Sequence, residues 1–426
     1  MKSTYYPSLQ ETLYRDTLPN GLPVIVLPRR GFSRKIAYFV TGNGAIHRKF
    51  RLNGKEITAS AGVAHFLEHK LFDMPGRDIP QEFAALGANP NAFTSYEMTA
   101  YYFSCTENFS QCLSLLLEFV STPYFTEESV AKEQGIIGQE IAMHRDNPDT
   151  CVFENLVAGM YAQHPIQETI LGTEQSIGEI TPEILNLCHS AYYAPKNMLL
   201  CVIGDVDPEE VRRLAIAALP NVETSAGEKL PMPQEEMTCP KTFTEVSMEV
   251  AMPMFQLGFK SQPIGTGRDA IFKEIVGDLA AEALFGESSE LYLQLYEQGL
   301  IDSSFGGGFE TIEGMSMLTA YGDSWQPKAV ADAILKQAEK LLQTGLNQQD
   351  FLRMKRSALG RRIRDLDSFD ATCFRLCAYY FAGFDYFQFP EVYRDVEIKD
   401  ILNFLQETIT QERCSLSVVL NREEQS

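Results

Sequence analysis

Positive charge is scarce in this sequence. Its 426 residues include 36 lysines and arginines against 57 aspartates and glutamates, which gives a formal net charge of −21 at pH 7. Binding to nucleic acid needs a basic surface that neutralises phosphates, and anionic membranes attract basic segments, so this balance disfavours both partners. The simplest interpretation is a well-solvated acidic surface, which is compatible with cationic or neutral peptides as ligands.

The sequence also lacks paired cysteines and long apolar runs. Its nine cysteines form no Cys-x-x-Cys pair, which argues against a disulfide framework or a structural zinc knuckle and fits a reducing compartment. Cys373 and Cys377 lie one helical turn apart, as two core thiols would. No stretch approaches the ~18 apolar residues that span a bilayer, and the start has no signal-peptide pattern. We therefore expect a cytoplasmic protein without a membrane segment.

The order of predicted elements is the same in the two halves of the chain. Each half reads as strand, strand, helix, strand, strand, several helices and a final strand, by its apolar periodicity. This order predicts a structural duplication of class α+β: two homologous halves, each an antiparallel sheet layered with helices. Residues 222–240 show neither the helical nor the alternating strand periodicity of apolar residues, which predicts a linker. We thus expect an N-terminal domain over 1–221 and a structurally similar C-terminal domain over 241–426.

One predicted helix, at residues 60–73, carries an unusual set of polar side chains. His65, Glu68 and His69 fall on one face, following the i, i+3, i+4 rule. Val63, Phe66, Leu67, Leu71 and Phe72 are apolar and predict that the helix is buried. Buried imidazoles and carboxylates are costly unless they are paired. A metal ion would satisfy all three, whereas the alternative is a helix with paired structural histidines.

The spacing of these residues is typical of zinc peptidases. Two histidines one turn apart can both bind zinc, and a neighbouring carboxylate that is not a ligand can take a proton from water. Here the order is H-x-x-E-H, the inverted form of H-E-x-x-H. The chain has only six histidines, so a chance match is improbable.

A catalytic zinc ion normally takes a third protein ligand. Glu133 and Glu140 lie seven residues apart on a predicted helix over 126–144, so they share one face. Two carboxylates on a packed face favour a cation, while unrelated charges on a solvated edge are the alternative. His144, one turn beyond Glu140, is a competing candidate.

These features resemble the pitrilysin-type inverzincins, the family of mitochondrial processing peptidase and insulin-degrading enzyme. His65-Phe-Leu-Glu68-His69 resembles the metal motif of that family, and Glu133 and Glu140 resemble its distal acidic pair. Asn91-Ala-Phe-Thr-Ser95 is similar to the strand that follows the motif. The resemblance extends over the whole chain and is closest to the short members from Gram-positive bacteria.

The resemblance implies a zinc metalloendopeptidase acting on peptides or small unfolded polypeptides. His65, His69 and Glu140 would bind Zn²⁺, and Glu68 would be the general base. Glu133 would not bind the metal but would support the ligands or the base. Substrate would add as an extra strand along Asn91, Ala92, Phe93 and Thr94. The first domain would then be catalytic, and the second would complete a substrate chamber.

One region departs from the family pattern. Members that act alone usually carry an arginine and a tyrosine in the second half, where this chain has Tyr296 and Asp302. This departure suggests the catalytic subunit of a heterodimer with a zinc-less paralogue, although a homodimer stays open. The glycine run 306–308 is either a substrate-guiding loop or, more simply, a strand end. The competing hypothesis for the whole chain is a peptide-binding or scaffolding subunit with little turnover.

Overall fold

The computed structural model describes residues 1–219 and 226–422, in two compact units. Each unit combines segments from both halves of the chain. The first contains Met1–Ile141, Thr169–Pro231 and Ile363–Phe387, and the second contains Ala142–Glu168, Met232–Arg362 and Gln388–Ser426. The predicted boundaries, 1–221 and 241–426, therefore differ from the units, because each half gives one internal segment to the other unit.

The first unit is built on a seven-stranded sheet. Its strands, in spatial order, are β1 (Lys2–Tyr6), β2 (Glu11–Thr17), β3 (Pro23–Pro28), β11 (Met198–Gly204), β4 (Lys35–Thr41), β10 (Thr99–Cys105) and β9 (Asn89–Thr94). Only the β3–β11 pair is parallel. One face is covered by α1 (Val63–Leu71), α2 (Ile79–Ala85), α3 (Phe109–Ser121), α7 (Pro182–Tyr192) and α8 (Pro208–Ala218), whose apolar side chains form one core with the strands.

The second unit repeats the core of this sheet. Its five strands are β13 (Phe243–Met248), β17 (Cys414–Asn421), β14 (Met254–Ser261), β16 (Met315–Asp323) and β15 (Gly306–Ile312). The order and every strand direction match those of β3, β11, β4, β10 and β9, including the single parallel pair. The helices of this unit include α9 (Gly267–Phe285), α10 (Glu290–Glu297), α11 (Pro327–Thr344), α12 (Gln348–Arg364), α14 (Phe389–Asp395) and α15 (Ile398–Thr408). The predicted duplication and α+β class are confirmed.

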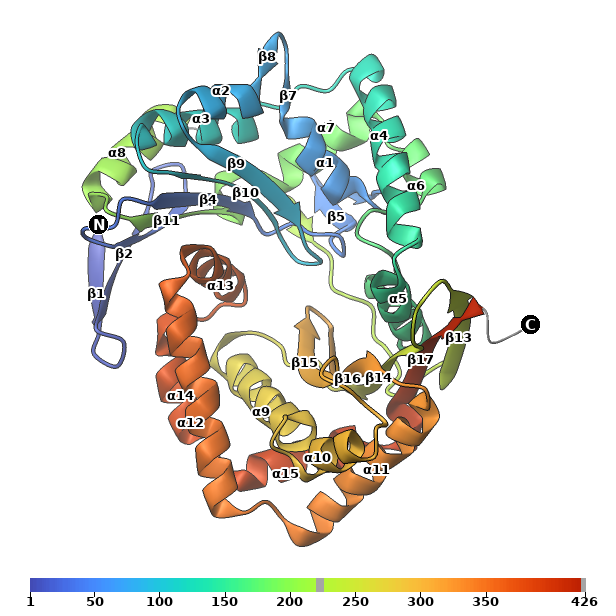
Figure 1. Ribbon diagram of the computed structural model, residues 1–426. Helices are drawn as coiled ribbons and strands as arrows, with labels where there is room; N and C mark the ends of the chain where they lie inside the picture. The colour runs from blue at the N-terminus through green and yellow to red at the C-terminus, as the bar shows by residue number, and fades with distance from the viewer. Residues whose placement is uncertain (220–225, 423–426) are drawn as a thin grey trace. The chain divides into compact units, whose positions relative to one another are not determined.

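The two halves also exchange a helix. Helix α13 (Phe369–Phe381), from the second half, packs on β4 and β11, on the opposite side of the first sheet from α3 and α8 (Figure 1). Helix α5 (Pro148–Met160), from the first half, packs on β14 and β17 of the second sheet. Each sheet is thus covered on its second face by a helix from the other half of the sequence, so neither half would bury both faces of its sheet alone.

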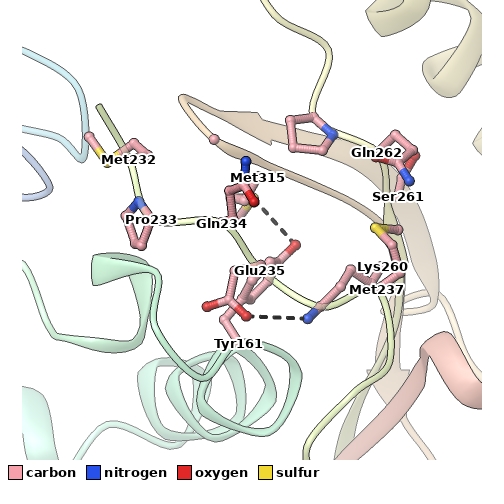
Figure 2. A pocket seen from close by; sticks show the side chains of 12 residues that line it. Tyr161, Met232, Pro233, Gln234, Glu235, Met237, Lys260, Ser261, Gln262 and Met315 are labelled. Carbon is pink, nitrogen blue, oxygen red and sulfur yellow. Dashed lines mark hydrogen bonds and ion pairs between the residues drawn. The ribbon is translucent and has the colours of Figure 1, made fainter. Parts of the chain in front are cut away.

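The described part of the predicted linker is packed against both units rather than free. Residues 222–225 lie outside the described residues. Strand β12 (Glu228–Lys229) pairs with β5 (Lys49–Leu52) of the first unit. Farther along, Glu235 accepts backbone hydrogen bonds from residues 162–164 and faces Lys260 in the second unit, beside a cavity of about 380 Å³ (Figure 2).

No helix within 1–219 or 226–422 is both long and apolar enough to cross a membrane. All nine cysteines are free thiols. Cys373 of α13 and Cys201 of β11 lie together in the core of the first unit, with their sulfurs 3.9 Å apart. The interpretation of Cys373 and Cys377 as buried core thiols is confirmed.

The packing of α9 on β15 predicts opposite effects for two glycine-to-alanine changes. A Cβ at Gly277 would lie 2.3 Å from the ring of Phe309, whereas a Cβ at Gly360 in α12 would meet no atom within 4 Å. We expect Gly277→Ala to lower the free energy of unfolding by roughly 1–3 kcal/mol through overpacking. Gly360→Ala should raise it by about 0.4–1 kcal/mol. Chemical denaturation measures both, and equal effects would contradict this packing.

Candidate metal site

The motif helix α1 is short and nearly buried. Gly62 precedes it with φ of 88°, and a Cβ there would lie 2.4 Å from the carbonyl oxygen of Leu171, so only glycine fits this start. Val63, Ala64, Phe66, Leu67 and Leu71 are all buried. His65 and Glu68 are only 7% and 9% exposed. The apolar residues thus fix the helix in the core and hold the polar side chains on the remaining face.

His65, His69 and Glu140 come together from two helices. Glu140 lies on α4 (Glu127–Arg145), and its Oε2 is 3.7 Å from the Nε2 atom of each imidazole. The three possible ligand atoms lie within 4.8 Å of one another, and no other group of three His, Cys, Asp or Glu residues in the described chain does so. His144, the competing candidate, is exposed and outside this group.

Two imidazoles and one carboxylate match the donor set of a catalytic zinc site. Tetrahedral zinc, with ligands at about 2.0–2.1 Å, separates neighbouring ligand atoms by about 3.3–3.5 Å. The observed distances of 3.7 Å are close to that value. The residues present therefore fit a zinc ion with only small side-chain adjustments.

Glu133 lies beside this group and bonds one of its histidines. Its Oε1 is 3.0 Å from Nδ1 of His69. Because a carboxylate accepts, Nδ1 is the nitrogen that donates, which leaves Nε2 directed at Glu140 as a lone-pair donor. Burial lowers the pKa of His69, but the bond to Glu133 and the surrounding carboxylates outweigh it, so the pKa is raised overall.

Glu68 is held apart from the group of three. Its Oε2 accepts a hydrogen bond of 2.6 Å from Oγ1 of Thr94. Burial raises the pKa of Glu68, and the hydrogen bond from Thr94 and the charge of His69 only partly oppose this shift. A carboxylate with a raised pKa is better suited to exchanging protons with water near neutral pH.

The predicted substrate strand is an edge of the first sheet. Asn91, Ala92, Phe93 and Thr94 belong to β9, which pairs only with β10 among the described strands. Its side chains alternate: Thr94 turns to Glu68, whereas the ring of Phe93 lies 5.8 Å from that of Phe374. The link from Thr94 to Glu68 was not predicted, because residues 26 positions apart in sequence share no local pattern.

In the second half, residues 241–422, which the structure describes, contain no comparable group. All six histidines lie outside α9, the helix that follows the second strand of the second sheet. Tyr296, on α10, is 55% exposed and stacks on Tyr292, and Asp302 accepts a hydrogen bond from the backbone of Ser304. The glycine run begins β15 and is paired with β16, so it is part of a strand rather than a loop.

Two family models match successive parts of the chain. The family "Insulinase (Peptidase family M16)" matches residues 55–174, and "Peptidase M16 inactive domain" matches residues 179–358. A Bacillus subtilis protein named as an uncharacterized zinc protease, YmfH, is 36% identical over 99% of both chains. A second such protein from that organism, YmxG, is 26% identical over 83% of this chain and 84% of its own.

Solved structures share the fold. A chain from Alicyclobacillus acidocaldarius, described as M16-like, has a TM-score of 0.92 and 30% identity and covers 96% of this chain and 98% of its own. A protease from Helicobacter pylori has a TM-score of 0.81 at 19% identity, covering 96% of this chain and 99% of its own, which is a likeness of fold alone. With a relative 36% identical over 99% of its length, the chain belongs to the insulinase family of peptidases, family M16.

Proposed function

We propose that this chain is a zinc metalloendopeptidase, with His65, His69 and Glu140 as metal ligands and Glu68 as the general base. The observation that carries the proposal is the group of two imidazoles and one carboxylate on α1 and α4, with a separate buried carboxylate on the same helix face. The relatives named as zinc proteases support the choice of metal.

In this proposal the two glutamates of the site have different tasks because their surroundings differ. Zinc bound there would lower the pKa of a water molecule and polarise the carbonyl of the scissile peptide bond. Glu68 takes the proton from the attacking water and returns it to the leaving amine. Thr94 keeps the Glu68 carboxylate oriented, and Glu133 fixes the tautomer of His69.

The substrate we propose is an extended peptide that adds to the free edge of β9. Backbone hydrogen bonds along Asn91, Ala92, Phe93 and Thr94 would bind it in a register that places one peptide bond near Glu68. Recognition through the backbone favours unfolded segments and broad sequence specificity. The cytoplasm, where such segments arise during protein turnover, stays the predicted location.

We also propose that a second chain completes the working site. Tyr296 and Asp302 occupy the region where an arginine and a tyrosine would hold the substrate backbone in related chains that act alone, and neither can replace a guanidinium. A paralogue that carries this pair but not the zinc ligands would supply the missing function in a heterodimer.

Replacing the third ligand tests the metal assignment. Glu140→Gln removes an anionic ligand, so zinc content should fall from about one ion per chain to near zero after dialysis, as measured by elemental analysis. Glu128→Gln is the matched control, because Glu128 is exposed in the first turn of the same helix. Zinc that persists in Glu140→Gln would refute the ligand assignment.

Replacing the base separates metal binding from catalysis. Glu68→Gln keeps the volume of the side chain but cannot accept a proton, so peptide hydrolysis should fall by roughly 10²–10⁴-fold. Zinc content should be unchanged, because Glu68 lies outside the group of ligands. Hydrolysis of a mixed peptide library, followed by mass spectrometry, measures the loss, and an active Glu68→Gln protein would disprove this role.

The proposed partner can be tested by mixing. The purified chain should cleave a peptide library slowly, and adding the paralogue should raise the rate roughly a hundredfold, since misplaced substrate costs about that much. Full activity of the chain alone would contradict the heterodimer. Bound zinc without cleavage, even with the paralogue present, would instead support the peptide-binding or scaffolding alternative.

A further inference from the structure

Lys70 is a charged residue in the interior of the motif helix. It directly follows His69, and its side chain is 0% exposed. Lysines are almost never fully buried, because an ammonium group that leaves water loses its favourable hydration. An apolar side chain would avoid this desolvation, so the contacts of the ammonium need an explanation.

The ammonium of Lys70 connects two helices. It forms an ion pair with the carboxylate of Asp73, just after α1, and donates to the carbonyl oxygen of Ser129 at 3.4 Å. Ser129 lies in the first turn of α4, and its carbonyl is one turn before Glu133. Adjacent residues of α1 therefore hold adjacent turns of α4: Lys70 at Ser129, and His69 at Glu133.

Helix α4 buries few side chains, and its other polar anchor is Gln134, whose Nε2 donates to the carbonyl oxygens of Ile177 and Ile180, each at 3.2 Å. Only three of its 19 residues are buried: Val130, Ile137 and Ile141. It also contains Gly135 and Gly138, around which a Cβ would meet no atom within 4 Å. Glycine weakens a helix interior relative to alanine, because it leaves the backbone more conformational freedom. The location of Glu140 therefore depends on a short row of polar contacts at Ser129, Glu133 and Gln134, of which the one to Lys70 is nearest the start of the helix.

We propose that Lys70 is a positioning residue for the metal site, holding α4 against α1 so that Glu140 meets His65 and His69. This inference rests on the proposed zinc function. Lys70 touches neither the metal nor the substrate in this role. Its effect passes through the Ser129 carbonyl to the helix that carries both acidic residues of the site.

The test compares the loss of two equally buried lysines. Lys260 is 1% exposed in the second unit, where it donates to the carbonyl of Glu236 and faces Glu235 (Figure 2). We expect Lys70→Met to weaken zinc binding roughly 10–100-fold, the usual effect of losing a residue that supports metal ligands. Lys260→Met should bind zinc as the unchanged protein does. Competition with a fluorescent chelator measures all three affinities.

A second measurement does not depend on the metal. In the zinc-free protein, Lys70→Met should raise amide hydrogen exchange in residues 127–141 selectively, and Lys260→Met should not. If Lys70→Met does not fold, Asp73→Asn is the alternative, because it removes only the charge partner of Lys70. It should also weaken zinc binding and raise amide exchange in residues 127–141, each by less than Lys70→Met would.

The outcomes separate the two proposals. Unchanged zinc affinity and unchanged α4 exchange in the Lys70→Met protein, or in Asp73→Asn where that protein does not fold, would overturn the role of Lys70. Equal loss of zinc in Lys260→Met would do the same, since the effect would then be general destabilisation. If the unchanged chain binds no zinc, the proposed function fails, and the exchange data alone decide whether Lys70 holds α4.

Discussion

The contact between an imidazole on α1 and a carboxylate on α4 is the interaction on which the candidate site depends. His69 and Glu133 are 3.0 Å apart, and this bond fixes both the ring orientation and the nitrogen that remains available. The two helices need such a bond because α4 buries only three side chains. A polar contact thus holds these two helices together, as apolar packing does in the rest of the core. The same contact involves His69, one of the proposed metal ligands.

The duplicated fold shows how separate this chemistry is from the scaffold. Both sheets have the same strand order and directions. In the first, the helix that follows β4 is preceded by a small hairpin and carries two histidines. In the second, α9, which follows the equivalent strand β14, carries none and approaches its sheet closely at Gly277. The same scaffold therefore holds reactive side chains in one copy and packing residues in the other. Function is a property of the site here, not of the fold.

Local patterns in the sequence predict many of the helices and strands. The features that could not be predicted depend on contacts between residues far apart in the sequence. The helices predicted over 60–73 and 126–144 are present as α1 (Val63–Leu71) and α4 (Glu127–Arg145). The face shared by His65, Glu68 and His69 follows from helical spacing alone. The exchanged helices could not be predicted, because an apolar face does not specify which sheet it will cover. The burial of Lys70 could not be predicted either, since its partner Ser129 lies 59 residues away.

The helix exchange also bears on the strand that we propose takes the substrate. Phe93 is the next-to-last residue of that strand, and on the sheet face away from Glu68 its ring is 5.8 Å from that of Phe374 of α13. Helix α13 comes from the second half of the chain, yet it is part of the first unit. Changes in the sequence of the second half can therefore alter the surroundings of β9 without any change in the zinc ligands. Backbone hydrogen bonds along the edge of β9 would still accept peptides of many sequences. The side chains on the sheet face away from Glu68 would then influence which of these peptides bind best.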